Sequence, residues 1–326
     1  MIAAVIPIKY RSAVDTHLRH YRALGYRYRG HACILSRLGR HLGKIGARDL
    51  DAAGYDSWCR SIADNKPNSR RKAQQIVRRF CLFRARTEPK FFVPCPFSMT
   101  KQQPYVRPVI VTPKQVARML AVADAVRDQS GPPMKASVHR IAVVLLYTAG
   151  LRMGELLRLD VTDVEDHIQV LRIRESKFHK SRLVPLSPSA RVEVQRYLRA
   201  RSRFCPEQAD RGPLLCNRKG DHLHGYSSPG IWGLVRRLFD RANVRDDEGR
   251  RPRFHDLRHS FAVQSLIRIY RAKGDVQSAL PKLALYMGHV SVESTLHYLR
   301  LVPEVAALAS KRFEEHFGHW VQGGES

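Results

Sequence analysis

Residues 287–298 of the chain read Met-Gly-His-Val-Ser-Val-Glu-Ser-Thr-Leu-His-Tyr. They follow an apolar helical run at residues 283–286, and the Gly-His pair predicts a turn after it. Ser291 belongs to a residue type that caps helix N-termini, so a new helix is expected to begin there. This stretch therefore predicts a helix, a turn that carries His289 and a second helix that carries Tyr298, nine positions later.

A second pattern lies upstream, where Phe-His-Asp-Leu-Arg-His-Ser-Phe-Ala occupies residues 254–262. His255 and Arg258 are three residues apart, which puts both side chains on one face of a helix. Arginine donates two parallel hydrogen bonds to phosphate oxygens and stays charged at neutral pH. The spacing therefore favours a phosphate-binding face, with Leu257 and Phe261 on the buried side.

His255 and His259 also permit a different interpretation. Two histidines four apart on a helix can bind zinc, as in a His-Glu-x-x-His helix. Here Asp256 takes the place of the glutamate, and no third ligand follows at the usual spacing. The clustered arginines disfavour a divalent cation in the same pocket, so we expect no metal.

A third pattern begins where an apolar helix at residues 141–147 stops before Gly150 and leads into Leu-Arg-Met-Gly-Glu at residues 151–155. Arg152 and Glu155 are three apart, so on a helix they share a face. The carboxylate of Glu155 is therefore expected to hold the Arg152 guanidinium in position.

Several basic residues precede the tyrosine in a fixed order, and the full set is Arg152, Lys177, His255, Arg258, His289 and Tyr298. In this order the chain resembles the tyrosine recombinases, or phage integrases, over roughly residues 112–300. The stretches 172–186 and 255–263 are similar to transposon-borne members. The resemblance implies a mainly α fold with a small β-sheet, in which a helical core-binding domain precedes the catalytic domain.

The same resemblance implies that Tyr298 attacks a DNA phosphodiester and leaves a 3′-phosphotyrosyl bond. A neutral phenol with a pKa near 10 attacks poorly, so it needs a proton acceptor and cations around it. We assign the proton to His255 and the phosphate to Arg152, Arg258 and His289. The covalent bond conserves energy, so neither a cofactor nor a metal is required. Tyr286 competes as nucleophile, but its apolar surroundings favour a core role.

Lys177 lies in the polar segment 175–181, between stretches with strand character at residues 168–173 and 182–186. A hairpin loop is therefore expected there. The resemblance implies that a lysine on this loop is the general acid for the departing 5′ oxygen. Lys180 is a competing candidate. Lys177 is favoured because it stands ahead of residues 179–186 as the family lysine stands ahead of its own strand.

The charge of the chain points to a polyanionic partner. Its 57 Lys+Arg and 29 Asp+Glu leave a formal net charge of +28. Residues 1–110 hold 22 Lys+Arg and 6 Asp+Glu, so the smaller part is the more basic one. Helical spacing of apolar residues predicts a helical DNA-binding domain over residues 1–87. A basic ridge on one of its helices predicts DNA contact by Arg70, Arg71, Lys72, Arg78 and Arg79. A solvated face is the alternative, which the scarcity of acidic residues disfavours.

Proline-rich segments predict a linker over residues 88–111. Thr112 followed by Pro113 is typical of a helix start, so the catalytic domain is expected over residues 112–326. At its end, Val305, Leu308, Ala309, Phe313 and Phe317 have the spacing of an amphipathic helix. The resemblance implies that this helix docks on a neighbouring subunit in a homo-tetramer or a mixed recombinase assembly on double-stranded DNA. A packed core helix is the alternative.

Sorting signals are few. Residues 1–8 are apolar but too short for a signal peptide, and charged residues interrupt every candidate membrane span. The six cysteines form no Cys-x-x-Cys pair, which disfavours a zinc finger or a disulfide scaffold and favours a reducing cytoplasm.

Three functional classes fit these patterns. A site-specific recombinase that integrates, excises or transposes a mobile element is preferred. A type IB topoisomerase-like relaxing enzyme would share the chemistry without synapsis or a specific site. A catalytically inactive DNA-binding regulator would retain binding alone.

Overall fold

The computed structural model describes residues 5–126, 134–165, 167–174, 181–219, 222–272 and 274–289, together with the single positions 291, 295, 298, 307, 310, 311, 314 and 315. The chain forms two compact units, Met1–Val106 and Arg107–Ser326. The division falls inside the segment 88–111 for which a linker is predicted. Each unit is mainly helical, and the small β-structure belongs to the second, which confirms the predicted fold class.

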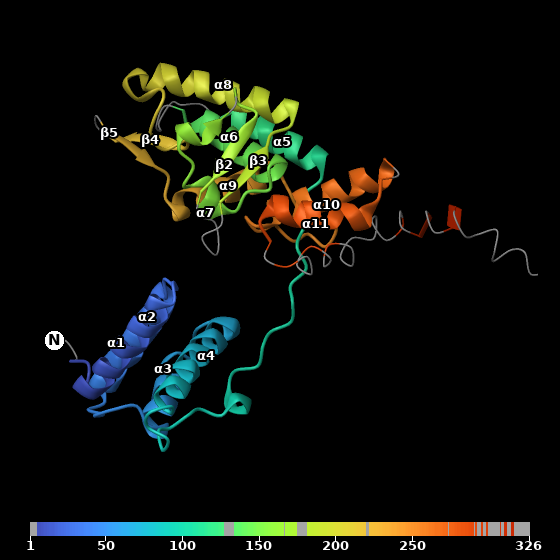
Figure 1. Ribbon diagram of the computed structural model, residues 1–326. Helices are drawn as coiled ribbons and strands as arrows, with labels where there is room; N and C mark the ends of the chain where they lie inside the picture. Colours follow the sequence, from blue (N-terminus) through green and yellow to red (C-terminus); the bar gives the residue numbers. More distant parts are fainter. Residues whose placement is uncertain are drawn as a thin grey trace, which may run out of the picture. The chain divides into compact units, whose positions relative to one another are not determined.

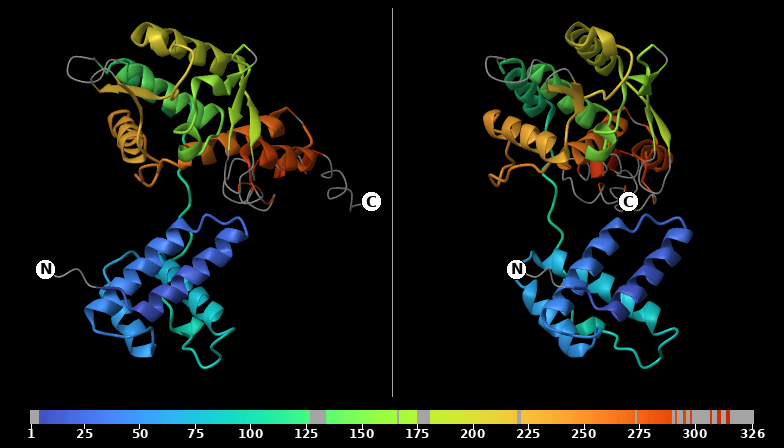
Figure 2. Two further views of the ribbon diagram at one scale, coloured as in Figure 1. Left: turned by 60° about the vertical axis from the view of Figure 1, so that its left-hand side comes forward. Right: turned by 90° about the vertical axis from the view of Figure 1, so that its left-hand side faces the viewer.

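Unit 1 contains four α-helices in the part that the structure describes (Figure 1). They are α1 (Ile8–Ala23), α2 (Arg29–Lys44), α3 (Ala52–Ser61) and α4 (Pro67–Arg84), followed by the short 3-10 helix η1 (Pro96–Ser98). α1 and α2 lie side by side in both views of Figure 2. A Cβ atom at Gly39 of α2 would come within 2.8 Å of the Tyr10 ring of α1, so the glycine permits this close approach.

The core of unit 1 is built from the apolar positions that recur at helical spacing. Leu35, Leu38 and Leu42 of α2 are fully buried and pack with Trp58 and Phe80. The hydroxyl of Tyr10 donates a hydrogen bond to the carbonyl of Leu35 at 2.8 Å. The chain after α4 also packs on this core, because residues 91–93 lie against it.

Unit 2 is a larger helical unit that also contains a three-stranded and a two-stranded antiparallel sheet. Its first helices are α5 (Pro113–Asp124), α6 (Lys135–Thr148) and α7 (Met153–Leu156), and the later ones are α8 (Pro188–Phe204), α9 (Ser228–Arg241), α10 (Asp256–Arg271) and α11 (Val276–Met287). Two 3-10 helices, η2 (Val161–Asp163) and η4 (Pro206–Gln208), connect elements. The predicted start of a helix at Thr112 is confirmed, since its side chain and that of Gln115 form a capping box on α5.

The three-stranded sheet has the order β1-β2-β3, with β1 (Val164–Glu165), β2 (Val170–Ile173) and β3 (Arg182–Pro185) all antiparallel. β2 and β3 confirm the two predicted strands, and Ile173 pairs with Arg182 at the end of their register. The buried residues 141–146 of α6 pack in the same core as the inward side chains of β2 and β3. The structure adds a second hairpin that the sequence patterns do not indicate, β4 (Cys216–Lys219) with β5 (His222–Gly225).

α10 and α11 lie side by side at one end of unit 2, shown in orange and red in Figure 1. Phe261, Leu266, Leu283 and Met287 share a small core there, and Tyr298 packs against it. Ahead of α5, the backbone N–H of Val111 donates to the Ser260 hydroxyl, which ties the entering chain to α10. The predicted C-terminal amphipathic helix lies outside the described residues at each of its apolar positions.

Candidate active site

Gly150 makes the turn that presents Arg152. It has a φ of +58°, which favours glycine. An added Cβ would also lie 2.5 Å from the Phe261 ring of α10. The turn therefore brings the end of α6 directly onto α10, and Arg152 follows it as the residue before α7.

Glu155 is the buried anion that organises the arginines. It accepts hydrogen bonds from the Arg152 guanidinium at 2.8 Å and from the Arg152 backbone N–H at 2.9 Å. Arg182 of β3 donates to both of its oxygens, each at 2.9 Å. Burial by itself would raise the pKa of this carboxyl, but the hydrogen bonds from Arg182 and Arg152 lower the pKa to about 2. Glu155 is therefore ionised at neutral pH.

Three arginines meet the C-terminal end of α11. Arg182 Nε donates to the carbonyl of Tyr286 at 2.8 Å, Arg258 to that of Met287, and Arg152 to that of Gly288 at 2.7 Å. The last carbonyls of a helix have no partner within it and carry partial negative charge. Cations from β3, α10 and the α6–α7 turn therefore cap α11 together.

Arg258 is the most deeply buried of these cations, with a relative exposure of 1%. It also donates to the Gly150 carbonyl, so it links the two turns that carry Arg152 and His289. Desolvation, and then the charge of Arg152, lower its pKa to about 9, while Glu155 opposes this shift. The guanidinium thus remains charged at neutral pH.

Gly288 ends α11 in the left-handed conformation with a φ of +66°, and the backbone N–H of His289 donates to the Ala284 carbonyl. The Nδ1 atom of His289 lies 2.8 Å from the hydroxyl of Thr295, which is fully buried. Desolvation, and then the charges of Arg258 and Arg152, lower the pKa of His289 to about 4. It is therefore neutral at pH 7 in the free protein.

Tyr298 is 3% exposed, and its hydroxyl lies 2.8 Å from the Nδ1 atom of His259. Its ring is stacked toward His289 at a centroid distance of 6.3 Å. Ionisation of its phenol would raise the pKa of Arg258, so the two groups lie close enough to interact electrostatically. The phenol therefore lies in the same cluster as the predicted basic residues.

His255 stands at the N-terminal end of α10, where its side chain is exposed. Its ring meets that of His259 edge to face at 4.7 Å. Desolvation, and then Arg258 and Arg152, lower its pKa. The competing nucleophile Tyr286 is engaged elsewhere, because its hydroxyl donates to the Pro185 carbonyl and burial raises its pKa to about 12.

The structure therefore brings together five predicted residues and their supporting carboxylate, namely Arg152, Glu155, His255, Arg258, His289 and Tyr298. Lys177 and its competitor Lys180 lie outside the described residues. The described residues contain no group of three His, Cys, Asp or Glu side chains placed to hold a metal ion.

Three neighbours of this cluster are site residues that the sequence does not single out: Arg182, His259 and Thr295. The pattern on α10 indicates His259 only as an alternative zinc ligand beside His255. Arg182 is indicated only as part of a strand. The spacing of Arg152 and Glu155 does not indicate that Glu155 also binds Arg182, which lies 27 residues further along the chain.

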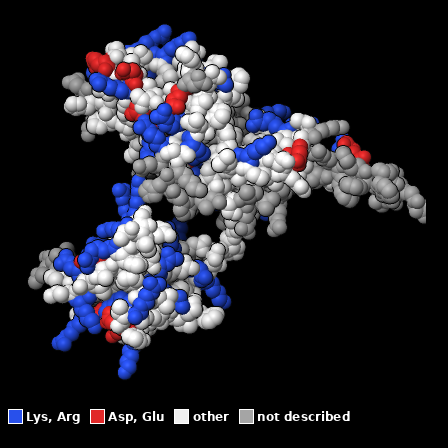
Figure 3. Space-filling model, in the orientation of Figure 1, with Lys and Arg blue, Asp and Glu red and all other residues white. Residues whose placement is uncertain are grey.

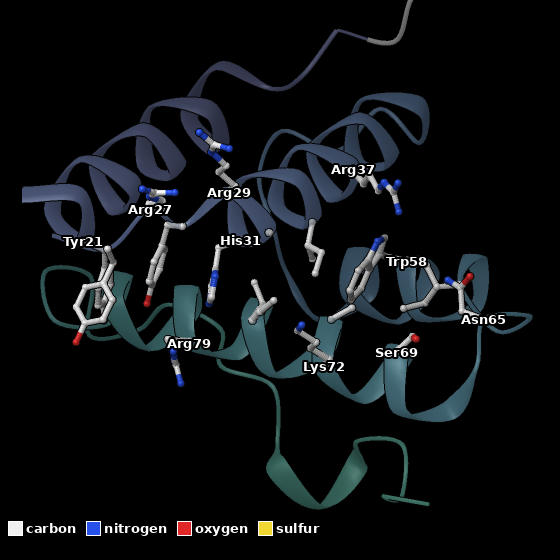
Figure 4. A pocket seen from close by; sticks show the side chains of 17 residues that line it. Tyr21, Arg27, Arg29, His31, Arg37, Trp58, Asn65, Ser69, Lys72 and Arg79 are labelled. Atoms are coloured by element: carbon white, nitrogen blue, oxygen red, sulfur yellow. The ribbon is translucent and has the colours of Figure 1, made fainter. Parts of the chain in front are cut away.

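The basic ridge of α4 divides into two groups. Arg70, Arg71 and Arg78 donate hydrogen bonds to the carbonyls of Ala63, Thr100 and Pro94, within unit 1. Lys72 and Arg79 are exposed and line a hollow of about 940 Å³ (Figure 4).

The hollow combines cations with aromatic rings. Arg27, Arg29 and Arg37 line it together with Lys72 and Arg79. Tyr28 stacks on Tyr21 at 4.6 Å and on His31 at 3.9 Å. Lys and Arg side chains also outnumber acidic ones on the face of unit 1 shown in Figure 3. Such a surface suits a nucleic acid, whose phosphates and bases offer charge and flat rings.

No helix among the described residues is long and apolar enough to cross a membrane.

Several known proteins are similar to this chain in sequence or in fold. Residues 110–304 match the model of the phage integrase family. The chain is 28% identical over 309 residues to the putative integrase/recombinase y4rB of Sinorhizobium fredii, covering 94% of this chain and 98% of that protein. It is 31% identical over 253 residues to y4rE of the same organism, covering 75% and 76%. Its fold is similar to that of the Tn1549 transposon integrase in complex with transposon right-end DNA, with a TM-score of 0.63 at 16% identity, covering 94% and 98%.

Proposed function

The chain belongs to the phage integrase family of tyrosine-type site-specific DNA recombinases, and on that premise we propose how its own residues break and rejoin double-stranded DNA. Tyr298 is the nucleophile, and its attack on a phosphodiester gives a 3′-phosphotyrosyl bond and a free 5′ hydroxyl. The observation that carries this assignment is the position of the Tyr298 phenol in one cluster with Arg258, His259 and His289.

Arg152, Arg258 and His289 bind the scissile phosphate and stabilise the charge that develops on it. The first two are already fixed by Glu155 and by backbone carbonyls, so little reorganisation is needed when the substrate arrives. Arg182 acts through Glu155 as a positioning residue. The exposed His255 is the catalytic histidine that faces the incoming DNA, and Lys177 protonates the leaving 5′ oxygen.

DNA affinity comes mainly from unit 1, as a core-binding domain over residues 1–87 connected by the segment 88–111 to the catalytic domain 112–326. Lys72 and Arg79, with the other cations of the hollow, contact DNA phosphates. Arg70, Arg71 and Arg78 support the same surface by fixing the segments that flank α4.

Strand exchange between two duplexes needs four cleavages. We therefore propose a homo-tetramer or a mixed recombinase assembly on DNA, in which the predicted helix at residues 305–317 docks on a neighbour. Removal of residues 301–326 should weaken cooperative synapsis more than binding to a single site. An equal loss of both would contradict the docking role. The reaction would serve a mobile element and take place in the cytoplasm.

A suicide-substrate assay tests this function. Duplexes that carry candidate element ends and a nick next to the scissile phosphate trap the covalent intermediate. Wild-type protein should form an adduct at Tyr298 in the presence of EDTA, and Tyr298→Phe should form none while it still binds the DNA. Strict magnesium dependence without an adduct would indicate a nuclease instead.

The same wild-type and Tyr298→Phe proteins also distinguish a recombinase from the other two functional classes. Relaxation of any supercoiled plasmid without recombination would indicate a topoisomerase-like enzyme. For a regulator, the wild type and the Tyr298→Phe variant would bind the site equally well, and neither protein would form an adduct.

A further inference from the structure

His259 lies beside the proposed nucleophile but has no chemical role in the mechanism given above. It follows Arg258 directly on α10, and its Nδ1 atom lies 2.8 Å from the Tyr298 hydroxyl. The two rings are inclined at 59° with centroids 5.5 Å apart. The distance is that of a hydrogen bond to the atom that is to attack phosphorus.

The two histidines of α10 have different surroundings. His255 is exposed, whereas His259 is half-buried between His255 and Tyr298. A substrate phosphate can therefore reach His255, while His259 is directed at the nucleophile. In this geometry His255 is placed to contact the DNA, and His259 contacts the phenol.

The charges that face His259 favour its neutral form in the free protein. Desolvation, and then the neighbouring His255, lower its pKa to about 4, and Arg253 and Arg258 act in the same direction while Asp256 opposes them. A neutral imidazole with its hydrogen on Nε2 has a lone pair on Nδ1. The Tyr298 hydroxyl can then donate its hydrogen bond to that lone pair.

We propose that His259 accepts the proton of Tyr298 during cleavage, a role that the sequence alone assigns to His255. As the Tyr298 oxygen forms its bond to phosphorus, its proton passes to Nδ1 of His259. The bond from phosphorus to the 5′ oxygen breaks, and that oxygen takes a proton from the general acid. Rejoining reverses each transfer. The anionic phosphate brought in by the DNA favours the imidazolium that forms. The inference rests on the proposed function, with Tyr298 as nucleophile.

Two substitutions of His259 separate proton transfer from positioning. His259→Asn places an amide near the position of Nδ1, which can accept a hydrogen bond but cannot take a proton. His259→Phe keeps a ring and removes both nitrogens. We expect each to slow single-turnover adduct formation on the suicide substrate about 100-fold at neutral pH, within the range for loss of a general base. DNA affinity and melting temperature should stay close to those of the wild type. Full activity of His259→Asn would overturn the proton transfer.

The pH dependence gives a readout that a structural role would not move. The gap in rate between wild type and His259→Asn should close as the pH rises from about 7 to about 9.5, since a phenol that is already ionised needs no base. A gap that stays constant across this range would overturn the proposal. If His259→Phe melts below the assay temperature, the asparagine variant decides alone.

A substrate with sulfur in place of the leaving 5′ oxygen identifies the side of the reaction on which His259 acts. Sulfur leaves without protonation, so the substrate relieves defects in the general acid. His259→Asn should remain slow on it, because its defect lies in the nucleophile, and rescue to the wild-type rate would overturn the proposal. His255→Asn is the matched comparison on the same helix. Wild-type adduct formation reports on the proposed function separately, whatever the His259 variants do.

Discussion

The two units of the chain hold their basic side chains in different ways. In unit 2, Arg152, Arg182 and Arg258 are held by Glu155 and by three consecutive backbone carbonyls. In unit 1, Lys72 and Arg79 extend into an open, aromatic-lined hollow. Fixed cations suit a charge that develops at one point, whereas exposed cations suit the many phosphates of a duplex.

Changing Arg258 to lysine tests most directly whether a fixed guanidinium is needed. Lysine keeps the positive charge but cannot hold two carbonyls and a phosphate with one planar fork. We expect cleavage of the suicide substrate to slow about 100- to 1000-fold, with DNA binding nearly unchanged. Arg268→Lys, on an exposed face of the same helix, is the matched control. A fast Arg258→Lys would show that charge alone suffices, and an equally slow Arg268→Lys would show that the loss is not specific to the fixed cation.

Changing Glu155 to glutamine tests whether the buried anion fixes the cations. The pKa of Glu155 in the folded protein, about 2, lies below its ordinary value of 4.5. Its contribution is therefore fully present above pH 4.5 and is lost as the pH falls through about 2. Glu155→Gln should lower the free energy of unfolding by about 3 kcal/mol at pH 7.

Chemical denaturation of Glu155→Gln and wild type at several pH values provides the measurement. The difference between them should shrink between about pH 5 and about pH 2. Exposed Glu207→Gln is the control and should show little difference at any pH. A destabilisation by Glu155→Gln that does not change with pH would mean that shape, rather than charge, is what Glu155 supplies.

The paired substitution Lys72→Ala and Arg79→Ala tests the exposed cations of unit 1. If each contacts one phosphate, the slope of log affinity against log salt should fall in magnitude by about 2. The rate of cleavage from saturated complexes should stay the same. Binding measured between about 50 and about 300 mM salt reports the slope. Arg11→Ala with Arg40→Ala removes the same charge from exposed positions outside the hollow, and a change of equal size would argue against specific contacts.

The smallest expected effect comes from Arg78→Ala. Its guanidinium donates to the Pro94 carbonyl at 3.1 Å, so its loss should cost about 1 kcal/mol of stability in unit 1. Arg78→Ala should change the slope of log affinity against log salt less than Arg79→Ala does. The two variants can be compared in the same salt titration. An equal slope change for both would place Arg78 on the DNA rather than on its own fold.

Local spacing explains what could be predicted. The start of α5 at Thr112, the strands β2 and β3, and the pairing of Arg152 with Glu155 all depend on residues close in the chain. A capping pair predicts the helix start, strand-forming residue types predict the strands, and a three-residue interval predicts the ion pair.

The rest depends on contacts between distant segments. His259 meets Tyr298 across 39 positions, and Arg182 meets the Tyr286 carbonyl across 104. No periodicity encodes such contacts. For the same reason, the run of cations on α4 does not reveal that Arg71 and Arg78 meet carbonyls at Thr100 and Pro94.

The arginine cap on α11 also has a consequence for biosynthesis. Arg152 is made long before Gly288, 136 positions later, and the two must meet before the phosphate-binding geometry exists. A ribosome-bound chain that ends before α11 would carry the basic surface of unit 1 but no assembled reaction centre. The phosphate-binding geometry can therefore form only late in synthesis, after Gly288 has been added.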